Sequence, residues 1–207
     1  NHIIMSFNAN NPNHIIIGLG GTGGKVLKAF KKRFFKEFPS PELRNGLTDH
    51  AIAFLYVDST REMLKPDDPT FRVAGQDASF TPQEFLDIKS IDLNQILDNI
   101  DNYPGLKHIV KDATAMRTTL GKVGAAAGQK RRAGRILFAA NCNRYLAALN
   151  DRYETLRKQT RLDSLHIHII TGLAGGTGSG SIIDAVAQAR VRYPEATIDV
   201  YAMVPEL

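Results

Sequence analysis

The chain carries a glycine-rich stretch at residues 174–180, Ala174-Gly175-Gly176-Thr177-Gly178-Ser179-Gly180. A run of strand-like residues at 165–171 precedes it, and a segment of helical character begins at Ser181. Glycines let the backbone curl closely around a ligand, and the amides that open a helix attract anions, most often phosphate. The stretch therefore indicates a phosphate-binding turn between a strand and a helix rather than a bare flexible turn.

A second glycine-rich loop occupies residues 18–24, Gly18-Leu19-Gly20-Gly21-Thr22-Gly23-Gly24. Its first, third and sixth positions match the dinucleotide-binding fingerprint. That fingerprint also expects an acidic residue about 20 residues further on, whereas Asp58 follows about 40 residues later. The loop is not a P-loop either, because Leu19 and Val26 stand where that motif needs a glycine and a hydroxyl residue. Lys25, directly after the loop, could face phosphate or solvent.

Strand-like and helix-like segments alternate along the chain, which predicts an α/β fold. We expect strands at residues 14–18, 51–57, 165–171 and 197–204, helices at 25–38, 91–100, 135–160 and 181–193, a short strand at 70–73 and a turn with helical character at 79–87. Continuous apolar runs predict a doubly wound, Rossmann-like, mostly parallel sheet with helices on both faces. Ligands bind beyond the carboxyl ends of such strands. If the strands before the two glycine loops are neighbours, the loops grip a polyphosphate from two sides.

The composition limits the classes of protein that the chain can belong to. Its 207 residues suffice for one or two domains, and a single cysteine, Cys142, fits a reducing compartment. We expect Cys142 to be a packed thiol. No secretory signal or long apolar run is evident, so we expect a cytoplasmic protein without membrane association. The net charge of +5 concentrates at residues 25–36 and 130–135, but nucleic-acid binding is not favoured because no recognition motif accompanies it.

His166 and His168 alternate along the strand predicted at residues 165–171, so they share one face. Metal ions can use this spacing. The sequence shows no third ligand, however, and the same pattern suits a strand face that lies under a helix or at a sheet edge. The sequence therefore favours a structural role for the two histidines.

Residues 174–180 resemble the nucleotide-binding loop of the tubulin/FtsZ superfamily, Gly-Gly-Gly-Thr-Gly-Ser/Thr-Gly, with alanine at the first position. Residues 20–25 resemble that family's first nucleotide loop, Asp58 stands at the place of its second loop, and residues 124–129 resemble its third. The arginines at positions 131, 132 and 135 depart from FtsZ and eukaryotic tubulin. The chain is therefore similar to a divergent, prokaryotic tubulin-like protein.

The resemblance implies binding of GTP or GDP with Mg²⁺. The nucleotide-binding residues that it implies are Gly20, Gly21, Thr22, Gly23, Gly24, Lys25, Asp58, Ala126, Ala127, Gly128, Ala174, Gly175, Gly176, Thr177, Gly178 and Ser179. Asp58 would approach Mg²⁺ through water, because this ion keeps much of its hydration. Arg131, Arg132 and Arg135 could contact the terminal phosphate, contact a neighbouring subunit, or form a solvated helix face.

The resemblance also implies a domain organisation. Residues 13–207 would be the amino-terminal nucleotide-binding domain of a longer protein, truncated before the family's central helix and C-terminal domain. Residues 1–12 would be a tag remnant or a flexible N-terminus, since residues 1–4 copy residues 13–16. We assign no catalytic residue within this chain. GTP hydrolysis is expected in the full-length protein, where the nucleotide would lie at a head-to-tail contact between subunits.

Two other functions remain open at the level of sequence. One is the Rossmann dinucleotide-binding domain of an oxidoreductase, which would leave the loop at residues 174–180 without a role. The other is a tubulin-like scaffold that binds nucleotide weakly and serves protein interactions.

Overall fold

The computed structural model describes residues 12–47, 51–64, 68–89, 92–120 and 130–204. Five strands form one sheet in the order β5-β2-β1-β6-β7. They are β1 (Asn13–Leu19), β2 (Ile52–Asp58), β5 (Phe85–Asp87), β6 (Leu165–Gly172) and β7 (Thr197–Met203). Every neighbouring pair is parallel, so the predicted doubly wound α/β fold is confirmed. The strand order reverses between β1 and β6, which places the switch point of the sheet there.

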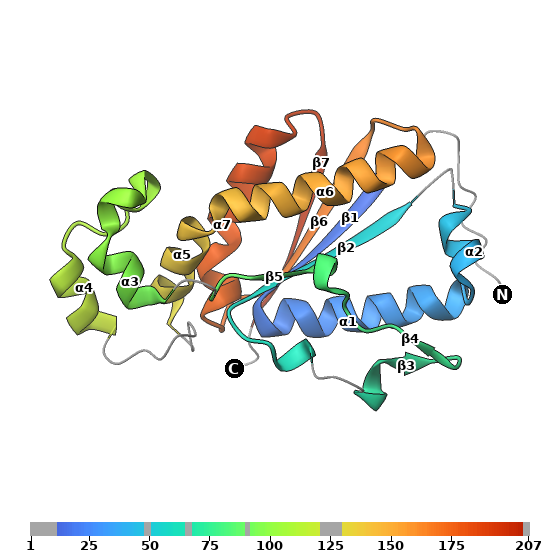
Figure 1. The fold of residues 1–207 in the computed structure, drawn as a ribbon, viewed down its shortest axis with the longest axis horizontal. Coiled ribbons are helices and arrows are strands. Elements are labelled where there is room, and N and C mark those ends of the chain that lie inside the picture. Colours follow the sequence, from blue (N-terminus) through green and yellow to red (C-terminus); the bar gives the residue numbers. More distant parts are fainter. Residues whose placement is uncertain (1–11, 48–50, 65–67, 90–91, 121–129, 205–207) are drawn as a thin grey trace.

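Helices cover both faces of this sheet (Figure 1). One face packs on α1 (Gly20–Glu37), and the other on α5 (Arg131–Ala140), α6 (Cys142–Thr160) and α7 (Thr177–Arg192). Successive residues of β1 point to opposite faces, so Ile15 and Ile17 join the core under α5, α6 and α7, while Ile16 joins the core under α1. Because both faces are covered, β2 carries a continuous apolar run from Ile52 to Val57, and β1 one from Ile15 to Ile17.

The remaining elements are short. They are α2 (Pro41–Asn45), α3 (Leu93–Asp98), α4 (Ala113–Leu120), the hairpin of β3 (Arg72–Val73) and β4 (Gln76–Asp77), and the 3-10 helices Glu62–Leu64, Pro69–Phe71, Pro82–Glu84, Ile100–Asn102 and Pro104–Leu106. Figure 1 shows α3 and α4 at one end of the molecule, beyond α5. Side chains cap several of the short helices: for example, Ser40 accepts a hydrogen bond from the Leu43 amide and Asp92 from the Asn94 amide.

The long helix expected at residues 135–160 is two helices, which is a correction to the sequence-based prediction. Helix α5 begins at Arg131, and the chain leaves helical geometry at Asn141, between α5 and α6. The buried Asn141 amide donates to the carbonyl oxygens of Ile88 and Leu137, at 3.0 and 2.8 Å. A buried amide held by partners from two segments fixes the break, and apolar spacing along α5 and α6 does not reveal it.

Several short elements also differ from the expectation, of which β5 and α4 are two. Residues 79–87 do contain a short helical turn, Pro82–Glu84, but they then form β5, which pairs with the end of β2. Helix α4 also lies in a part of the chain for which no element was predicted. Both are short, and short segments carry too few residues to show a period.

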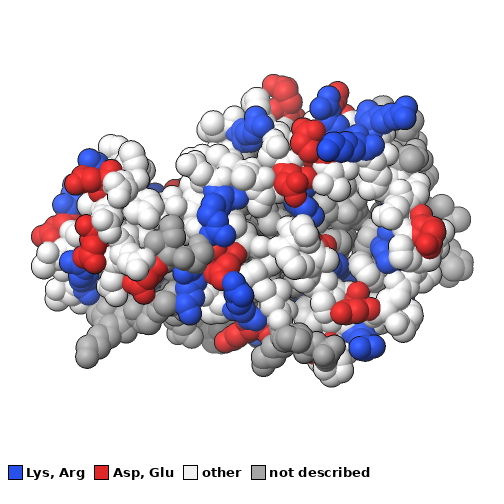
Figure 2. Space-filling view, viewed as in Figure 1, with Lys and Arg blue, Asp and Glu red and all other residues white. Residues whose placement is uncertain are grey.

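The surface mixes charged and apolar side chains. Figure 2 shows Lys and Arg interspersed with Asp and Glu on the face in view, without a continuous basic patch among its coloured residues. Strand β7 ends the sheet, and several of its side chains are exposed, including Val200, Tyr201 and Met203. Within the described residues, no helix is both long enough and apolar enough to cross a bilayer.

Candidate functional site

The two glycine loops meet at the switch point of the sheet. Strands β1 and β6 are parallel neighbours, with Leu19 paired in register with Thr171, so both loops begin at the carboxyl ends of adjacent strands. Contact between the loops is close: a Cβ atom at Gly20 would lie 2.7 Å from the Gly178 nitrogen. Gly20 also has a φ of +68°, which L side chains rarely adopt. As the sequence predicted, the loops face each other, and Gly20 must be glycine for both reasons.

Two long helices begin at this junction without side-chain caps. Helix α1 starts at Gly20 and α7 at Thr177, and neither has a side-chain cap or an acidic residue in its first turn. The first amides of a helix have no partner within the helix, and they carry the positive end of its dipole. A negatively charged ligand at this junction would satisfy both helix ends together.

A hollow of about 270 Å³ lies between these helix starts. Its lining residues are Leu19, Gly20, Gly21, Thr22, Lys25, Asp58, Ser59, Thr60, Glu62, Gly172, Gly175, Gly176, Thr177 and Gly178. Both loops and the end of β2 thus contribute to one hollow. A Cβ atom at Gly21 or Gly175 would meet nothing within 4 Å, so at these two positions the bare backbone borders open space.

Some of the residues predicted for the site lie beside the hollow rather than on its lining. A Cβ atom at Gly23 would lie 2.4 Å from the Ile170 carbonyl oxygen, and one at Gly24 would lie 2.5 Å from the Tyr56 ring. These two glycines therefore let α1 pack closely on the sheet. Ala174 is exposed. Ser179 donates a hydrogen bond back to the Gly175 carbonyl oxygen, within its own helix turn.

Asp58 lies at the end of β2 and is only 3% exposed. Its carboxylate accepts hydrogen bonds from the Tyr56 hydroxyl at 2.5 Å, the Ser59 amide at 2.7 Å and the Thr60 hydroxyl at 3.2 Å. Burial, together with the adjacent Asp58 carboxylate, raises the pKa of Tyr56, so this hydroxyl stays a donor. Since both carboxylate oxygens already accept bonds, the geometry suits Mg²⁺ contact through water better than direct coordination.

The hollow also contains residues that the sequence analysis did not single out: Ser59, Thr60, Glu62 and Gly172. Each lies at the carboxyl end of β2 or β6 or shortly after it. Polar residues that follow parallel strands gather at one sheet edge. The run Asp58-Ser59-Thr60 could therefore have been included from the sequence alone.

The side-chain charge around the hollow is negative overall. Lys25 is the one cation among the lining residues, and Asp58 and Glu62 are both acidic. A polyphosphate would therefore not be held by side-chain charge. Positive potential here would come from the amides of α1 and α7 and from a bound divalent cation.

The arginines predicted as phosphate or subunit contacts lie on α5, outside the lining. Arg131 donates to the Ser179 hydroxyl at 3.3 Å and to the Leu173 carbonyl oxygen at 3.1 Å, and so braces the second loop. Arg135 pairs with Asp184 through two hydrogen bonds, of 3.0 and 3.3 Å, which raise the pKa of Arg135. Arg132 is exposed. The predicted contacts at Ala126, Ala127 and Gly128 lie outside the described residues.

Helix α5 packs against α7 at unusually short range. A Cβ atom at Gly134 would lie 2.2 Å from the Gly176 carbonyl oxygen, and one at Gly180 would lie 2.4 Å from the Arg131 carbonyl oxygen. Backbone thus meets backbone on both sides, which only glycine permits. This contact holds the second glycine loop in place from the side of α5.

Comparisons with known proteins agree with this architecture. The family model described as "Tubulin like" matches residues 15–206. Among solved structures, the chain is similar to CetZ from Methanosaeta thermophila strain DSM 6194, with a TM-score of 0.59 and 16% identity over 94% of this chain and 37% of that chain. This likeness shows a shared fold. No curated protein matches the sequence.

Two further similar structures come from Haloferax volcanii. One is CetZ1, described as a GDP-bound monomer, with a TM-score of 0.47 and 16% identity over 93% of this chain and 41% of that chain. The other is CetZ2, described as a GTPgS-bound protofilament, with a TM-score of 0.45 and 17% identity over 93% of this chain and 39% of that chain. The chain thus spans about two fifths of the length of each solved structure.

Proposed function

The chain belongs to the tubulin-like family, and from this premise we propose that it binds the phosphates of a guanine nucleotide, GTP or GDP, between its two glycine loops. The observation that carries the proposal is the convergence of two uncapped helix starts, at Gly20 and Thr177, on one hollow. Such helix starts offer phosphate oxygens free amide donors and the positive end of the helix dipole. A pair of them on opposite sides suits a di- or triphosphate better than a single phosphate.

Within this proposal each side of the hollow has a separate role. Gly21 and Thr22 present the first turn of α1 to one side of the phosphates, and Lys25 adds the one positive side chain of the lining. Gly175 and Gly176 lead into α7 on the opposite side. The open space beside Gly21 and Gly175 is where backbone and ligand would approach most closely. Ser179 and Arg131 would act indirectly, by holding the second loop in place.

Mg²⁺ is the second part of the proposal. The residues present fit the ion, because Asp58, Ser59 and Thr60 place carboxylate and hydroxyl oxygens beside the hollow. Bound there, Mg²⁺ would neutralise phosphate charge that the side chains leave uncompensated. The hydrogen bonds of Tyr56, Ser59 and Thr60 to Asp58 fix the orientation of its carboxylate, which could then accept hydrogen bonds from water on the ion.

The family also supports a proposal for the full-length protein. Residues 13–207 would be its nucleotide-binding domain, and GTP would lie at a head-to-tail contact between subunits of a prokaryotic, cytoplasmic assembly. Head-to-tail contacts that do not close produce open filaments. Hydrolysis would belong to that assembly, because we assign no catalytic residue to this chain. Light scattering of the full-length protein with GTP or GDP tests this, and nucleotide-independent scattering would contradict it.

Binding of labelled GTP, ATP and NAD, each measured with and without Mg²⁺, tests the nucleotide proposal. We expect Mg²⁺-dependent binding of a nucleoside triphosphate, with GTP preferred to ATP when the full-length protein is used. A preference for NAD would instead indicate an oxidoreductase-type dinucleotide domain. A folded protein that binds none of the three would indicate an interaction scaffold.

Three glycine substitutions locate the binding site with a matched control. Gly21→Ala and Gly175→Ala add a methyl group to open space in the hollow, at positions where φ is not positive, so the fold should tolerate them. Each should weaken nucleotide binding at least about tenfold, because backbone and phosphate could no longer approach closely. Gly105→Ala, also in open space but within the 3-10 helix Pro104–Leu106, should leave affinity unchanged. Equal nucleotide affinities for all three variants would show that the nucleotide does not bind in the hollow.

A further inference from the structure

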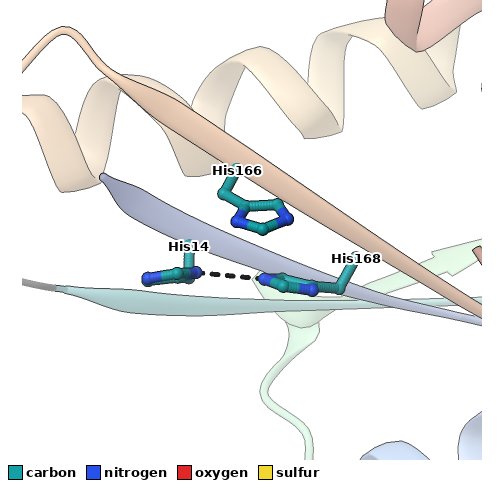
Figure 3. A group of neighbouring side chains, drawn as sticks. All are labelled: His14, His166 and His168. Atoms are coloured by element: carbon teal, nitrogen blue, oxygen red, sulfur yellow. Dashed lines mark hydrogen bonds between the residues drawn. The ribbon is translucent and has the colours of Figure 1, made fainter. Parts of the chain in front are cut away.

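Three histidines from two neighbouring strands meet on the α1 face of the sheet (Figure 3). His14 near the start of β1 pairs in register with His166 of β6, and His168 lies two residues further along the same face. All three side chains are half-buried. The sequence indicated His166 and His168 as a possible metal pair without a third ligand. The structure supplies that ligand, because parallel pairing brings His14 from 154 residues away to His168.

The ring nitrogens of these histidines are close enough to share one ion. His14 Nδ1 lies 3.0 Å from His168 Nε2. The rings of His166 and His168 stack with centroids 4.0 Å apart, and one nitrogen from each of the three rings lies within 4.8 Å of the others. A tetrahedral zinc ion with bonds of about 2.0–2.1 Å to nitrogen needs ligand atoms about 3.3 Å apart. One pair already meets this spacing, and the third ring needs a shift of at most about 1.5 Å.

Polar side chains of β7 also contact two of the histidine rings and orient them. The Nε2 atom of His166 lies 2.8 Å from Asp199 Oδ2, and the Nδ1 atom of His168 lies 3.3 Å from the Tyr201 hydroxyl. Histidines that bind metals almost always bond a carboxylate or another polar group through the second ring nitrogen, which fixes the tautomer. Asp199 therefore leaves His166 Nδ1 available, and Tyr201 leaves His168 Nε2 available, which is the atom that faces His14.

We propose that His14, His166 and His168 form a three-imidazole binding site for a divalent transition metal ion, with Zn²⁺ as the best fit. Imidazole nitrogen suits zinc, copper and nickel better than magnesium or calcium, which prefer oxygen. Three protein ligands leave the fourth tetrahedral position for water or another ligand. A hollow of about 460 Å³, lined in part by His14, His168 and Tyr201, provides room for it.

This site is distinct from the proposed nucleotide site. His14 lies near the amino end of β1, whereas Leu19, which borders the nucleotide hollow, ends the same strand. Five residues of extended strand separate the two sites by about 16 Å. The metal proposal therefore stands on separate residues, and loss of nucleotide binding would not affect it.

Calorimetric titration of the protein with Zn²⁺, and with Co²⁺ whose visible absorption reports its coordination, tests the proposal. We expect one ion per chain, and a tetrahedral cobalt spectrum. Replacing His14, His166 or His168 by alanine should each weaken Zn²⁺ binding at least about tenfold, and Asp199→Asn should weaken it about tenfold through His166. His108→Ala, which removes an exposed histidine far along the chain from the cluster, is the matched control and should bind as the wild type does.

Measurements on the wild-type protein test the metal site even if a histidine variant fails to fold. Zn²⁺ that binds the folded state should raise the thermal unfolding midpoint of the wild type and of His108→Ala. Absence of stoichiometric Zn²⁺ and Co²⁺ binding by the wild type would overturn the proposal. Binding that is unchanged in folded variants of the three histidines, or that is lost equally in His108→Ala, would overturn it as well.

Discussion

The side-chain oxygens of Ser59 and Thr177 lie 2.9 Å apart, although 118 residues separate them in the sequence. Both residues are buried, at 1% and 6% exposed. Their hydrogen bond connects the end of β2 to the first residue of α7, and both side chains line the hollow between the glycine loops. The bond therefore links the Asp58 side of the candidate site to the second loop.

The effects of substituting Ser59 and Thr177 on the free energy of unfolding should not be additive. Thr177→Val keeps the side-chain volume and removes the hydroxyl, so we expect it to lower the free energy of unfolding by about 1 kcal/mol. Ser59→Ala should have an effect of similar size. Because both remove the same bond, the double variant should cost about 0.5–1 kcal/mol less than the two single effects added together. Urea unfolding of the four proteins measures this, and strictly additive effects would show that the bond does not stabilise the fold.

Replacement of Asp58 should separate its proposed role in Mg²⁺ binding from its contribution to stability. Asp58→Asn removes the charge that would orient the water shell of Mg²⁺, so the gain in GTP affinity on adding Mg²⁺ should fall at least about tenfold. Tyr56→Phe is the matched control: it removes one hydrogen bond to the same carboxylate and should cost about 1 kcal/mol of stability while the Mg²⁺ dependence remains. If Asp58→Asn shows the full Mg²⁺ dependence, Asp58 has no role at the ion.

The buried ion pair of Lys31 and Glu84 should contribute strongly to the free energy of unfolding. Lys31 is almost fully buried, its Nζ lies 2.6 Å from Glu84 Oε2, and it also donates to the Ser79 carbonyl oxygen at 2.7 Å. Burial lowers the pKa of Lys31, and Glu84 opposes that shift. Glu84→Gln would leave a buried ammonium without its counter-charge, so it should lower the free energy of unfolding by about 3 kcal/mol.

The exposed ion pair of Arg33 and Glu37 provides the matched control for that measurement. The substitution Glu37→Gln makes the same chemical change in a pair that water already screens. It should cost less than about 1 kcal/mol in the same unfolding assay. Equal losses for Glu84→Gln and Glu37→Gln would contradict this prediction.

Stability should also fall as the histidine cluster is acidified. Burial, and then the nearby His166, lower the pKa of His168 below 6.5, while Asp199 opposes the shift. His14 also faces His168 in the cluster. Below pH 6.5 the unfolded chain therefore takes up a proton at His168 that the folded protein resists, so stability is lost as the pH falls.

Thermal unfolding between about pH 7 and pH 5, in metal-free buffer, measures this effect. The midpoint should fall less steeply in His168→Asn than in the wild type, whereas His108→Asn should follow the wild type. Identical slopes for all three proteins would show that His168 titrates alike in the folded and unfolded states.

Much of the fold could be predicted from the sequence, because local patterns are sufficient for it. The strand-like run at residues 165–171 matches β6 to within one residue, and the helical spacing after Lys25 predicts the end of α1 to within one residue. Helix starts were less accurate: α1 and α7 begin within the glycine loops, at Gly20 and Thr177, several residues before the expected positions. Glycine disfavours a helix and has no side chain to show a helical period, so helix starts made of glycine are missed in the sequence.

The sequence by itself determined the strand–glycine–helix units, because each unit depends on residues that are adjacent in the chain. The tertiary structure decided which units meet. Pairing of β1 with β6 brings Gly20 against Gly178 at one end of the sheet and His14 against His168 at the other. Parallel pairing joins segments about 150 residues apart, and its register comes from the packing of whole layers rather than from any local pattern. For that reason the glycine loops could be recognised in the sequence, while the three-histidine cluster could be found only in the folded chain.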